Sequence, residues 1–239
     1  MNNVKKSIGW ADFTVNPVKG KCPVACPYCY ARRLYDRFKW NPEIRYDPDA
    51  FNGLPSKPSR IFVGSTMELF GDWVERDWWH MIMAKCLSRP QHTFIFLTKQ
   101  PQNLPKKFPD NCYIGVSVTS EVQLRPAIWK LNDVQCNKRF LSLEPLLEPV
   151  FNQVLPAEWD TDIDWIIIGQ QTPIRKETTP KIEWIREIVE AADKAGIPVF
   201  LKDNLYPLIH YERRVKDRGW LKYYEIGENL RQEIPRCGY

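Results

Sequence analysis

The chain has 239 residues, a net charge of +5, and hydrophobic and charged fractions of 44% and 26%. These values are typical of a globular protein with one large core, and they exclude a disordered chain and a histone-like polyanion binder. No apolar stretch reaches the roughly 18 residues of a membrane span, and residues 1–6 lead into no signal peptide, so we expect a cytoplasmic protein without a membrane segment.

The first elements are a weak strand pattern at 13–16 and, after a gap, a helix pattern at 31–38. Between them lie Cys22, Cys26 and Cys29. Three thiolates within eight residues can hold an iron–sulfur cluster and leave one iron open for another ligand. Because of this spacing, the segment is the first candidate for a catalytic metal site.

A zinc site is the alternative for these cysteines, with a fourth ligand from a distant cysteine or from one of three histidines, His80, His92 and His210. Zinc sites more often use paired CxxC motifs, and the sequence has no second one. The other four cysteines are most simply buried or unused thiols, and the alternative role is a hydrogen-atom donor: Cys86, Cys112, Cys136 and Cys237. An odd total of seven without a disulfide-like framework indicates a reducing compartment.

Short, continuously apolar runs predict six further strands, which suit a parallel sheet covered by helices: 61–63, 94–97, 113–118, 140–143, 165–168 and 199–201. Helix patterns lie between several of them. The alternation predicts an α/β fold with right-handed parallel crossovers, either a barrel or an open doubly wound sheet. The proline-rich segment 100–109 is too broken for a full helix.

Two of these helix patterns have assignable ends and packed faces. A helix over 73–88 is predicted to begin at the pair Asp72 and Glu75 and to pack through Val74, Trp78, Met81 and Ile82. A helix over 180–195 is predicted to have Thr179 as its cap and Pro180 in its first turn, to end at Gly196, and to pack through Ile182, Ile185, Val189 and Ala192.

The motif CxxxCxxC, with Tyr28 before its third cysteine, resembles the signature of the radical S-adenosylmethionine (SAM) superfamily. There, three cysteines bind a [4Fe–4S] cluster, SAM occupies the fourth iron, and electron transfer yields a 5′-deoxyadenosyl radical that abstracts a substrate hydrogen atom. The resemblance implies a partial (β/α)6 barrel, with one strand more than that core needs. It also implies a [4Fe–4S] cluster, SAM and an external electron donor such as a flavodoxin or ferredoxin. We expect one domain over 1–239, with its core at about 7–204 and a C-terminal extension at 205–239.

In parallel α/β barrels, ligands bind at the carboxyl ends of the strands. After the strand at 61–63 come Gly64, Ser65 and Thr66, where the superfamily places its contact with the SAM amino group. Gly64 permits close backbone approach, and the two hydroxyls offer oxygens to an ammonium group. The alternative is a glycine-containing turn with a helix cap.

Polar residues also follow the next two strands. Lys99 follows the strand at 94–97 and is a candidate contact for substrate or a carboxylate, unless it is simply solvated. Ser117 and Thr119, at the end of the strand at 113–118, are candidates for contacts with the ribose hydroxyls of SAM.

The last two candidate positions lie further along the chain. Glu144 directly follows the strand at 140–143 and is the predicted catalytic carboxylate; the alternative is a surface glutamate that opens a turn. Gly169 and Gln170 follow the strand at 165–168 and are expected to approach adenine.

Seven segments between residue 7 and about 204 also resemble a narrower, phage-associated domain family of unassigned function that has a three-cysteine motif: 7–18, 62–65, 96–99, 115–118, 141–147, 165–169 and 199–202. Two features differ from that group: its first cysteine gap is often longer, and its turn at 169–172 is richer in glycine and serine.

For the substrate, the C-terminal stretch 210–224 interleaves cations with aromatic residues, a combination that suits single-stranded nucleic acid or an extruded base. A solvated helix or hairpin face is the alternative. Three functions follow: radical SAM chemistry on DNA or RNA, the same chemistry on a peptide or small metabolite, and a zinc-stabilised nucleic-acid-binding protein. The sequence favours the first.

Overall fold

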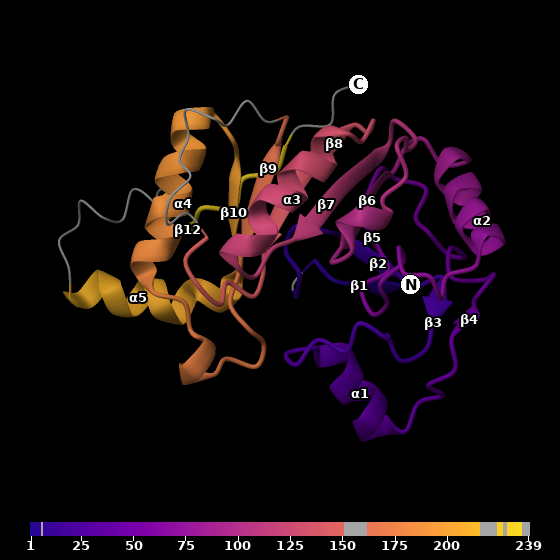
Figure 1. Cartoon of the computed structure of the whole chain (residues 1–239), viewed down its shortest axis with the longest axis horizontal. Helices are drawn as coiled ribbons and strands as arrows, with labels where there is room; N and C mark the ends of the chain where they lie inside the picture. The colour runs from indigo at the N-terminus through magenta and orange to yellow at the C-terminus, as the bar shows by residue number, and fades with distance from the viewer. Residues whose placement is uncertain (6, 151–161, 216–223, 227–228, 236–239) are drawn as a thin grey trace. The chain divides into compact units, whose positions relative to one another are not determined.

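The computed structural model describes residues 1–5, 7–150, 162–215, 224–226 and 229–235 (Figure 1). The chain forms two compact units, and each is described by itself. Unit 1 comprises residues 1–116 and 133–137, and unit 2 comprises residues 117–132 and 138–239. The sequence predicts one domain with an extension at 205–239, of which 216–223, 227–228 and 236–239 lie outside the described residues.

Unit 1 is built on strands in the order β1 (Asn2–Asn3), β2 (Phe13–Val15), β5 (Arg60–Val63), β6 (Thr93–Thr98) and β7 (Cys112–Ser117). Strands β2, β5, β6 and β7 run parallel, and only β1 is antiparallel to its neighbour β2. Their side chains are almost entirely buried, as the continuous apolar runs predict. All the parallel strands therefore end at the same edge of this sheet.

Two helices complete unit 1, α1 (Tyr30–Phe38) and α2 (Arg76–Leu87), together with a two-stranded antiparallel sheet of β3 (Val18–Lys19) and β4 (Arg45–Tyr46). The segment after β6 contains only a 3₁₀ turn, Pro101–Asn103, which confirms that this proline-rich link is no full helix. Helix α2 begins three residues later than predicted. Its Ile82 is buried as expected, but Met81 is exposed, so the predicted packed face is wrong at that residue.

Unit 2 contains the parallel strands β8 (Lys138–Leu143), β9 (Trp165–Ile168) and β10 (Val199–Leu201), in that order. Its helices are α3 (Glu121–Asn132), α4 (Ile182–Ala195) and α5 (Tyr206–Val215), with 3₁₀ turns at Lys176–Thr178 and Asp203–Leu205. Strand β11 (Glu225–Ile226) pairs antiparallel with β12 (Asn229–Leu230).

Helix α4 buries the four predicted residues Ile182, Ile185, Val189 and Ala192 and ends at Gly196 as expected. It begins at Ile182, however, so Lys181 rather than Thr179 is its cap, and Pro180 precedes it.

Part of the predicted extension belongs to the core of unit 2. Glu233 accepts a hydrogen bond from the Trp165 indole N–H through its backbone oxygen (2.8 Å), and it exchanges two further hydrogen bonds with Val199. The segment around residue 233 therefore packs on β9 and β10.

Every predicted strand is present, and the alternation of parallel strands with helices confirms the α/β class. Among the described residues, no helix is both long and apolar enough to cross a membrane.

Candidate functional site

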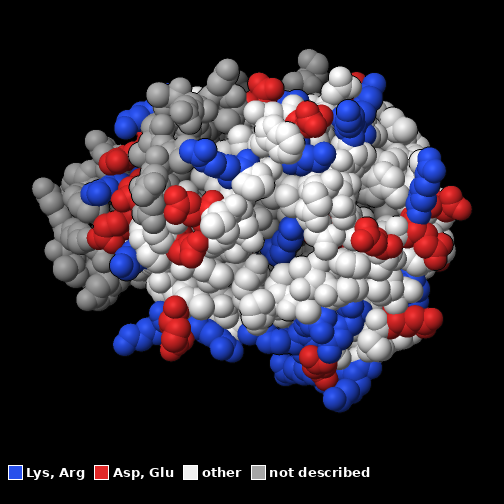
Figure 2. Space-filling model, in the orientation of Figure 1, with Lys and Arg blue, Asp and Glu red and all other residues white. Residues whose placement is uncertain are grey.

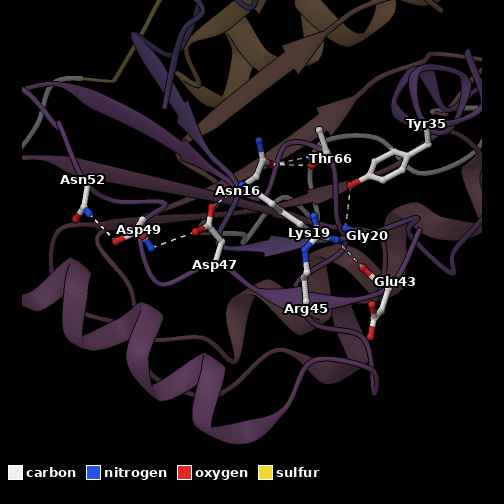
Figure 3. Close-up of polar contacts among 10 residues, drawn as sticks. All are labelled: Asn16, Lys19, Gly20, Tyr35, Glu43, Arg45, Asp47, Asp49, Asn52 and Thr66. Atoms are coloured by element: carbon white, nitrogen blue, oxygen red, sulfur yellow. Dashed lines mark hydrogen bonds and ion pairs between the residues drawn. The ribbon is translucent and has the colours of Figure 1, made fainter. Parts of the chain in front are cut away.

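The loop that carries the three cysteines is fixed at its beginning by Gly20 (Figure 3). The Gly20 N–H donates a hydrogen bond to the hydroxyl of Tyr35, a buried residue of α1, at 2.8 Å. A Cβ atom at Gly20 would lie 2.6 Å from the backbone oxygen of Glu43, which leaves no room for a side chain. The loop therefore leaves β3 on a defined path between α1 and the segment before β4.

At its other end the loop is joined to α1 by Cys29, which is the N-cap of that helix. The Cys29 sulfur accepts a hydrogen bond from the backbone N–H of Arg32 at 3.5 Å, and the Arg32 guanidinium donates to the Cys22 carbonyl at 2.5 Å. Between these residues Ala25 has a φ of 53°, in the left-handed region that costs a non-glycine residue roughly 1–2 kcal/mol. Such stored strain is characteristic of functional loops.

Cys22, Cys26 and Cys29 are all half-buried thiols. Burial raises the pKa of Cys22, and the negative charges of Glu68 and Cys29 act in the same direction, while backbone hydrogen bonds from Glu68 and Val24 oppose the shift. The Cys22 sulfur therefore lies beside the backbone of the loop that follows β5.

That loop is held by Asn16, the residue that directly follows β2 (Figure 3). The Asn16 Oδ1 accepts three hydrogen bonds: from the Thr66 N–H and hydroxyl, both at 3.0 Å, and from the Ser65 hydroxyl at 3.2 Å. Because both hydroxyl hydrogens point to Asn16, the lone pairs of the two hydroxyl oxygens remain available as acceptors. The two oxygens can therefore accept hydrogen bonds from a donor such as an ammonium group.

The same loop contributes Glu68, a buried carboxylate. Its Oε1 accepts hydrogen bonds from the Thr98 hydroxyl (2.8 Å) and the Phe70 N–H (3.1 Å), and its Oε2 accepts one from the Lys99 N–H (2.7 Å). The carboxylate thus connects the ends of β5 and β6.

Two aromatic residues connect the cysteine loop with these strand ends. The Lys99 ammonium lies 5.6 Å from the ring centre of Tyr28, within cation–π range. The Tyr30 hydroxyl donates to the Ser65 carbonyl at 3.1 Å. The structure therefore brings together eight predicted site residues of unit 1: Cys22, Cys26, Cys29, Tyr28, Gly64, Ser65, Thr66 and Lys99.

Within the described residues, no three His, Cys, Asp or Glu side chains converge closely enough to hold a metal ion as they stand. The donor set nevertheless fits an iron–sulfur cluster, because three half-buried thiols share one loop of eight residues. The Arg32 guanidinium binds the Cys22 carbonyl of this loop, and the Lys99 ammonium lies over the ring of Tyr28. These two cations would offset the negative charge of bound thiolates.

In unit 2, the predicted catalytic carboxylate Glu144 forms an ion pair with Lys202, the residue after β10. Both side chains are largely buried. Gly169, after β9, lies against this pair: a Cβ atom there would be 3.0 Å from Lys202 and 3.2 Å from Glu144. Glu144 is therefore part of a packed ion pair at the strand ends, and not a surface glutamate.

Gln170 is buried and bound to Asn204 on three sides: its N–H donates to the Asn204 Oδ1 at 3.3 Å, its side-chain amide donates to the Asn204 carbonyl, and its carbonyl accepts from the Asn204 amide at 2.6 Å. The Gln170 Oε1 is buried without a hydrogen-bond partner within the described part of the chain. A buried acceptor atom in a protein normally receives a hydrogen bond, so a ligand could supply the missing donor.

Ser117 and Thr119 are both buried. The Thr119 N–H and hydroxyl both donate to the Gln123 side chain, at 2.8 and 3.2 Å, which satisfies the start of α3. Thr119 is therefore bound to Gln123, within the same segment of the chain.

Four residues that organise these groups received no role from the sequence, although the segment 202–204 also follows a predicted strand: Asn16, Glu68, Lys202 and Asn204. Each follows a strand or belongs to a loop between a strand and a helix, a position at which ligand-binding residues are frequent. That position is the signal that could have identified them.

Comparison with known proteins gives one family. No curated protein and no solved structure matches the chain. A family model described as "Protein of unknown function (DUF5131)" matches residues 5–218, which is most of the chain. The chain therefore belongs to this DUF5131 family.

Proposed function

We propose that the chain is a radical SAM enzyme that abstracts a hydrogen atom from a nucleic-acid base or nucleotide. The observation that carries the proposal is the position of the cysteines. They lie between β3 and helix α1, after the first parallel strand, β2, and next to the loop that follows the second parallel strand, β5. Within the proposal, the α/β units form a partial (β/α)6-type barrel.

In this proposal, Cys22, Cys26 and Cys29 would hold a [4Fe–4S] cluster and leave one iron open for SAM. Such a cluster would supply the one electron needed to cleave SAM reductively to methionine and a 5′-deoxyadenosyl radical. The electron comes from an external one-electron donor such as a flavodoxin or ferredoxin. A reducing cytoplasm is the compartment in which such thiolates persist.

The loop after β5 supports the binding of an amino group. The Ser65 and Thr66 hydroxyls both donate to Asn16, so their oxygens can accept from an ammonium group. The buried Glu68 adds negative charge to the same loop, and its three hydrogen bonds keep the loop in place. These residues bind and orient, and the proposal assigns them no proton transfer.

Unit 2 adds a separate argument for a ligand. The buried Gln170 Oε1 needs a hydrogen-bond donor, and the exocyclic amino group of adenine is one. The Glu144–Lys202 pair offers an acid and a base side by side for polar groups of a ligand.

The decisive experiment is anaerobic reconstitution with iron and sulfide. We expect about four irons per chain and broad visible absorption. Addition of dithionite and SAM should then release 5′-deoxyadenosine. Cys26→Ala should lose both the cluster and the release, whereas Cys136→Ala, outside the motif, should retain both.

Each other outcome contradicts a defined part of the proposal. One zinc per chain and a colourless protein would support the zinc-stabilised binding protein instead. A bound cluster whose chemistry is stimulated by a peptide or metabolite, and not by DNA or RNA, would overturn the nucleic-acid substrate alone.

A further inference from the structure

The positive charge of this protein is concentrated in one short segment. Residues 17–46 contain seven Lys and Arg against two Asp and Glu, a net charge of +5, which equals the net charge of all 239 residues. The remainder of the chain is therefore balanced. Figure 2 shows Lys and Arg side chains gathered over α1, the helix that follows the cysteine loop.

The two acids of this segment offset part of that charge. Asp36 is bound to the Lys21 ammonium at 2.5 Å, and this hydrogen bond is the main cause that holds its pKa below the ordinary value. Glu43 accepts a hydrogen bond from the Arg45 guanidinium only through its backbone oxygen. Three cations at the end of α1 and on β4 are exposed: Arg37, Lys39 and Arg45.

Exposed aromatic rings accompany these cations. Phe38 and Trp40 are 52% and 47% exposed, and their rings stack with centroids 5.5 Å apart. The Arg37 guanidinium lies 5.3 Å from the centre of the Phe38 ring. Two large rings left in water beside a guanidinium are costly unless they serve a contact, because burial of such rings is favourable.

We propose that this α1 surface, defined as Arg37, Phe38, Lys39, Trp40 and Arg45, binds single-stranded nucleic acid. The cations contact phosphates, and the Phe38 and Trp40 rings stack on unpaired bases. The inference builds on the proposed function, in that it names the surface that holds the substrate strand next to the cysteine loop.

The surface fits a single strand better than a duplex or an acidic protein. Bases in a duplex are already stacked and paired, so exposed rings gain nothing from them unless a base is extruded. An acidic protein, such as an electron donor, would use the cations but leave Phe38 and Trp40 without stacking partners. The test therefore has to separate charge from stacking.

The first arm of the test measures charge. Binding of the full-length protein to fluorescein-labelled dT20 and rU20 is followed by fluorescence anisotropy at several KCl concentrations. In the double variant Arg37→Gln/Lys39→Asn, the slope of log K against log salt should shrink by about 1.4, because each phosphate contact on a single strand contributes about 0.7. Asn at position 39 suits the left-handed conformation found there.

The matched control removes the same charge elsewhere. Arg175→Gln/Lys176→Gln, at two exposed positions of unit 2, should leave the slope unchanged. An equal loss of slope in both double variants would overturn the proposal, because binding would then follow net charge and not this surface.

The second arm measures stacking. Phe38→Ala should weaken binding about tenfold at every salt concentration without changing the slope, because stacking of a base on a ring carries no counterion release. Trp129→Ala, which removes a ring that is 77% exposed on α3, should have no effect. If Phe38→Ala fails to fold, as judged by thermal unfolding, Trp40→Ala tests the same stacking with the other exposed ring of the surface.

A competitor identifies the class of partner. Poly-L-glutamate should compete with dT20 far less well than unlabelled dT20 does. Equal competition would overturn the proposal in favour of an acidic protein partner. Release of 5′-deoxyadenosine is measured separately on the wild-type protein, so binding without release contradicts the proposed chemistry, and release without binding contradicts this surface.

Discussion

The carboxylate of Glu68 accepts a hydrogen bond from the backbone N–H of Lys99 at 2.7 Å, which fixes the loop after β5 to the end of β6. The same carboxylate accepts from Thr98 and Phe70. A buried group that accepts three hydrogen bonds organises its surroundings, because each donor would otherwise be left without a partner.

Glu68→Gln tests this role. In either orientation of the new amide, its NH2 group would face a hydrogen-bond donor that the carboxylate now satisfies. We expect the free energy of unfolding to fall by about 1–3 kcal/mol, measured by urea denaturation. The control Glu75→Gln alters an exposed residue without a side-chain capping bond and should change stability by less than about 0.5 kcal/mol.

A glycine pair separates backbone strain from steric clash. Gly64 and Gly53 both have positive φ, 82° and 75°, so alanine at either position is strained. A Cβ at Gly64 would lie 2.6 Å from the buried Leu69 side chain, whereas a Cβ at Gly53 would meet nothing within 4 Å. Gly53→Ala should cost about 1 kcal/mol, and Gly64→Ala about 1–3 kcal/mol more, in thermal unfolding. Equal losses would show that Leu69 moves aside freely.

The predicted strands were located well because burial on both faces leaves an unbroken apolar run, as in β9, Trp165–Ile168. Helix α3 was missed for two physical reasons. Pro126 lies inside it, and Val122 and Trp129 are 81% and 77% exposed, so apolar residues also lie outside its buried face of Leu124, Ala127 and Leu131. These exposed apolar residues obscure the helical period of the buried face.

The candidate site was predicted in part for a similar reason. A site whose residues lie in one short segment, such as Cys22 to Cys29, can be recognised from the spacing of those residues in the sequence. The contacts of Asn16 with Ser65 and Thr66 depend instead on the pairing of β2 with β5, two strands that are more than 40 residues apart. A local sequence pattern does not show which strands are neighbours, so the position of Asn16 after a strand could be predicted but its partners could not.

The ion pair of Glu144 and Lys202 can be measured by a double-mutant cycle with Glu144→Gln and Lys202→Met. Both side chains are less than a quarter exposed, so we expect a coupling energy of about 0.5–3 kcal/mol. The comparison cycle uses Arg186 and Glu190, a more exposed pair on α4, where about 0.3–0.5 kcal/mol is expected. A coupling energy of Glu144 and Lys202 no larger than that of Arg186 and Glu190 would show that the pair does not stabilise the fold.

The stability of the protein should depend on pH through His92. Burial lowers the pKa of this histidine, and the charge of Arg89 acts in the same direction. The unfolded chain therefore takes up a proton near pH 6.5 that the folded protein does not, so this contribution to stability is complete above that pH and is lost as the pH falls below it. His92→Phe removes the titrating group but keeps a ring beside Phe94. Urea denaturation at pH 7.5 and 5.0 should show the variant losing less stability on acidification than the wild type. An equal loss in both proteins would mean that His92 takes up its proton equally well in the folded state.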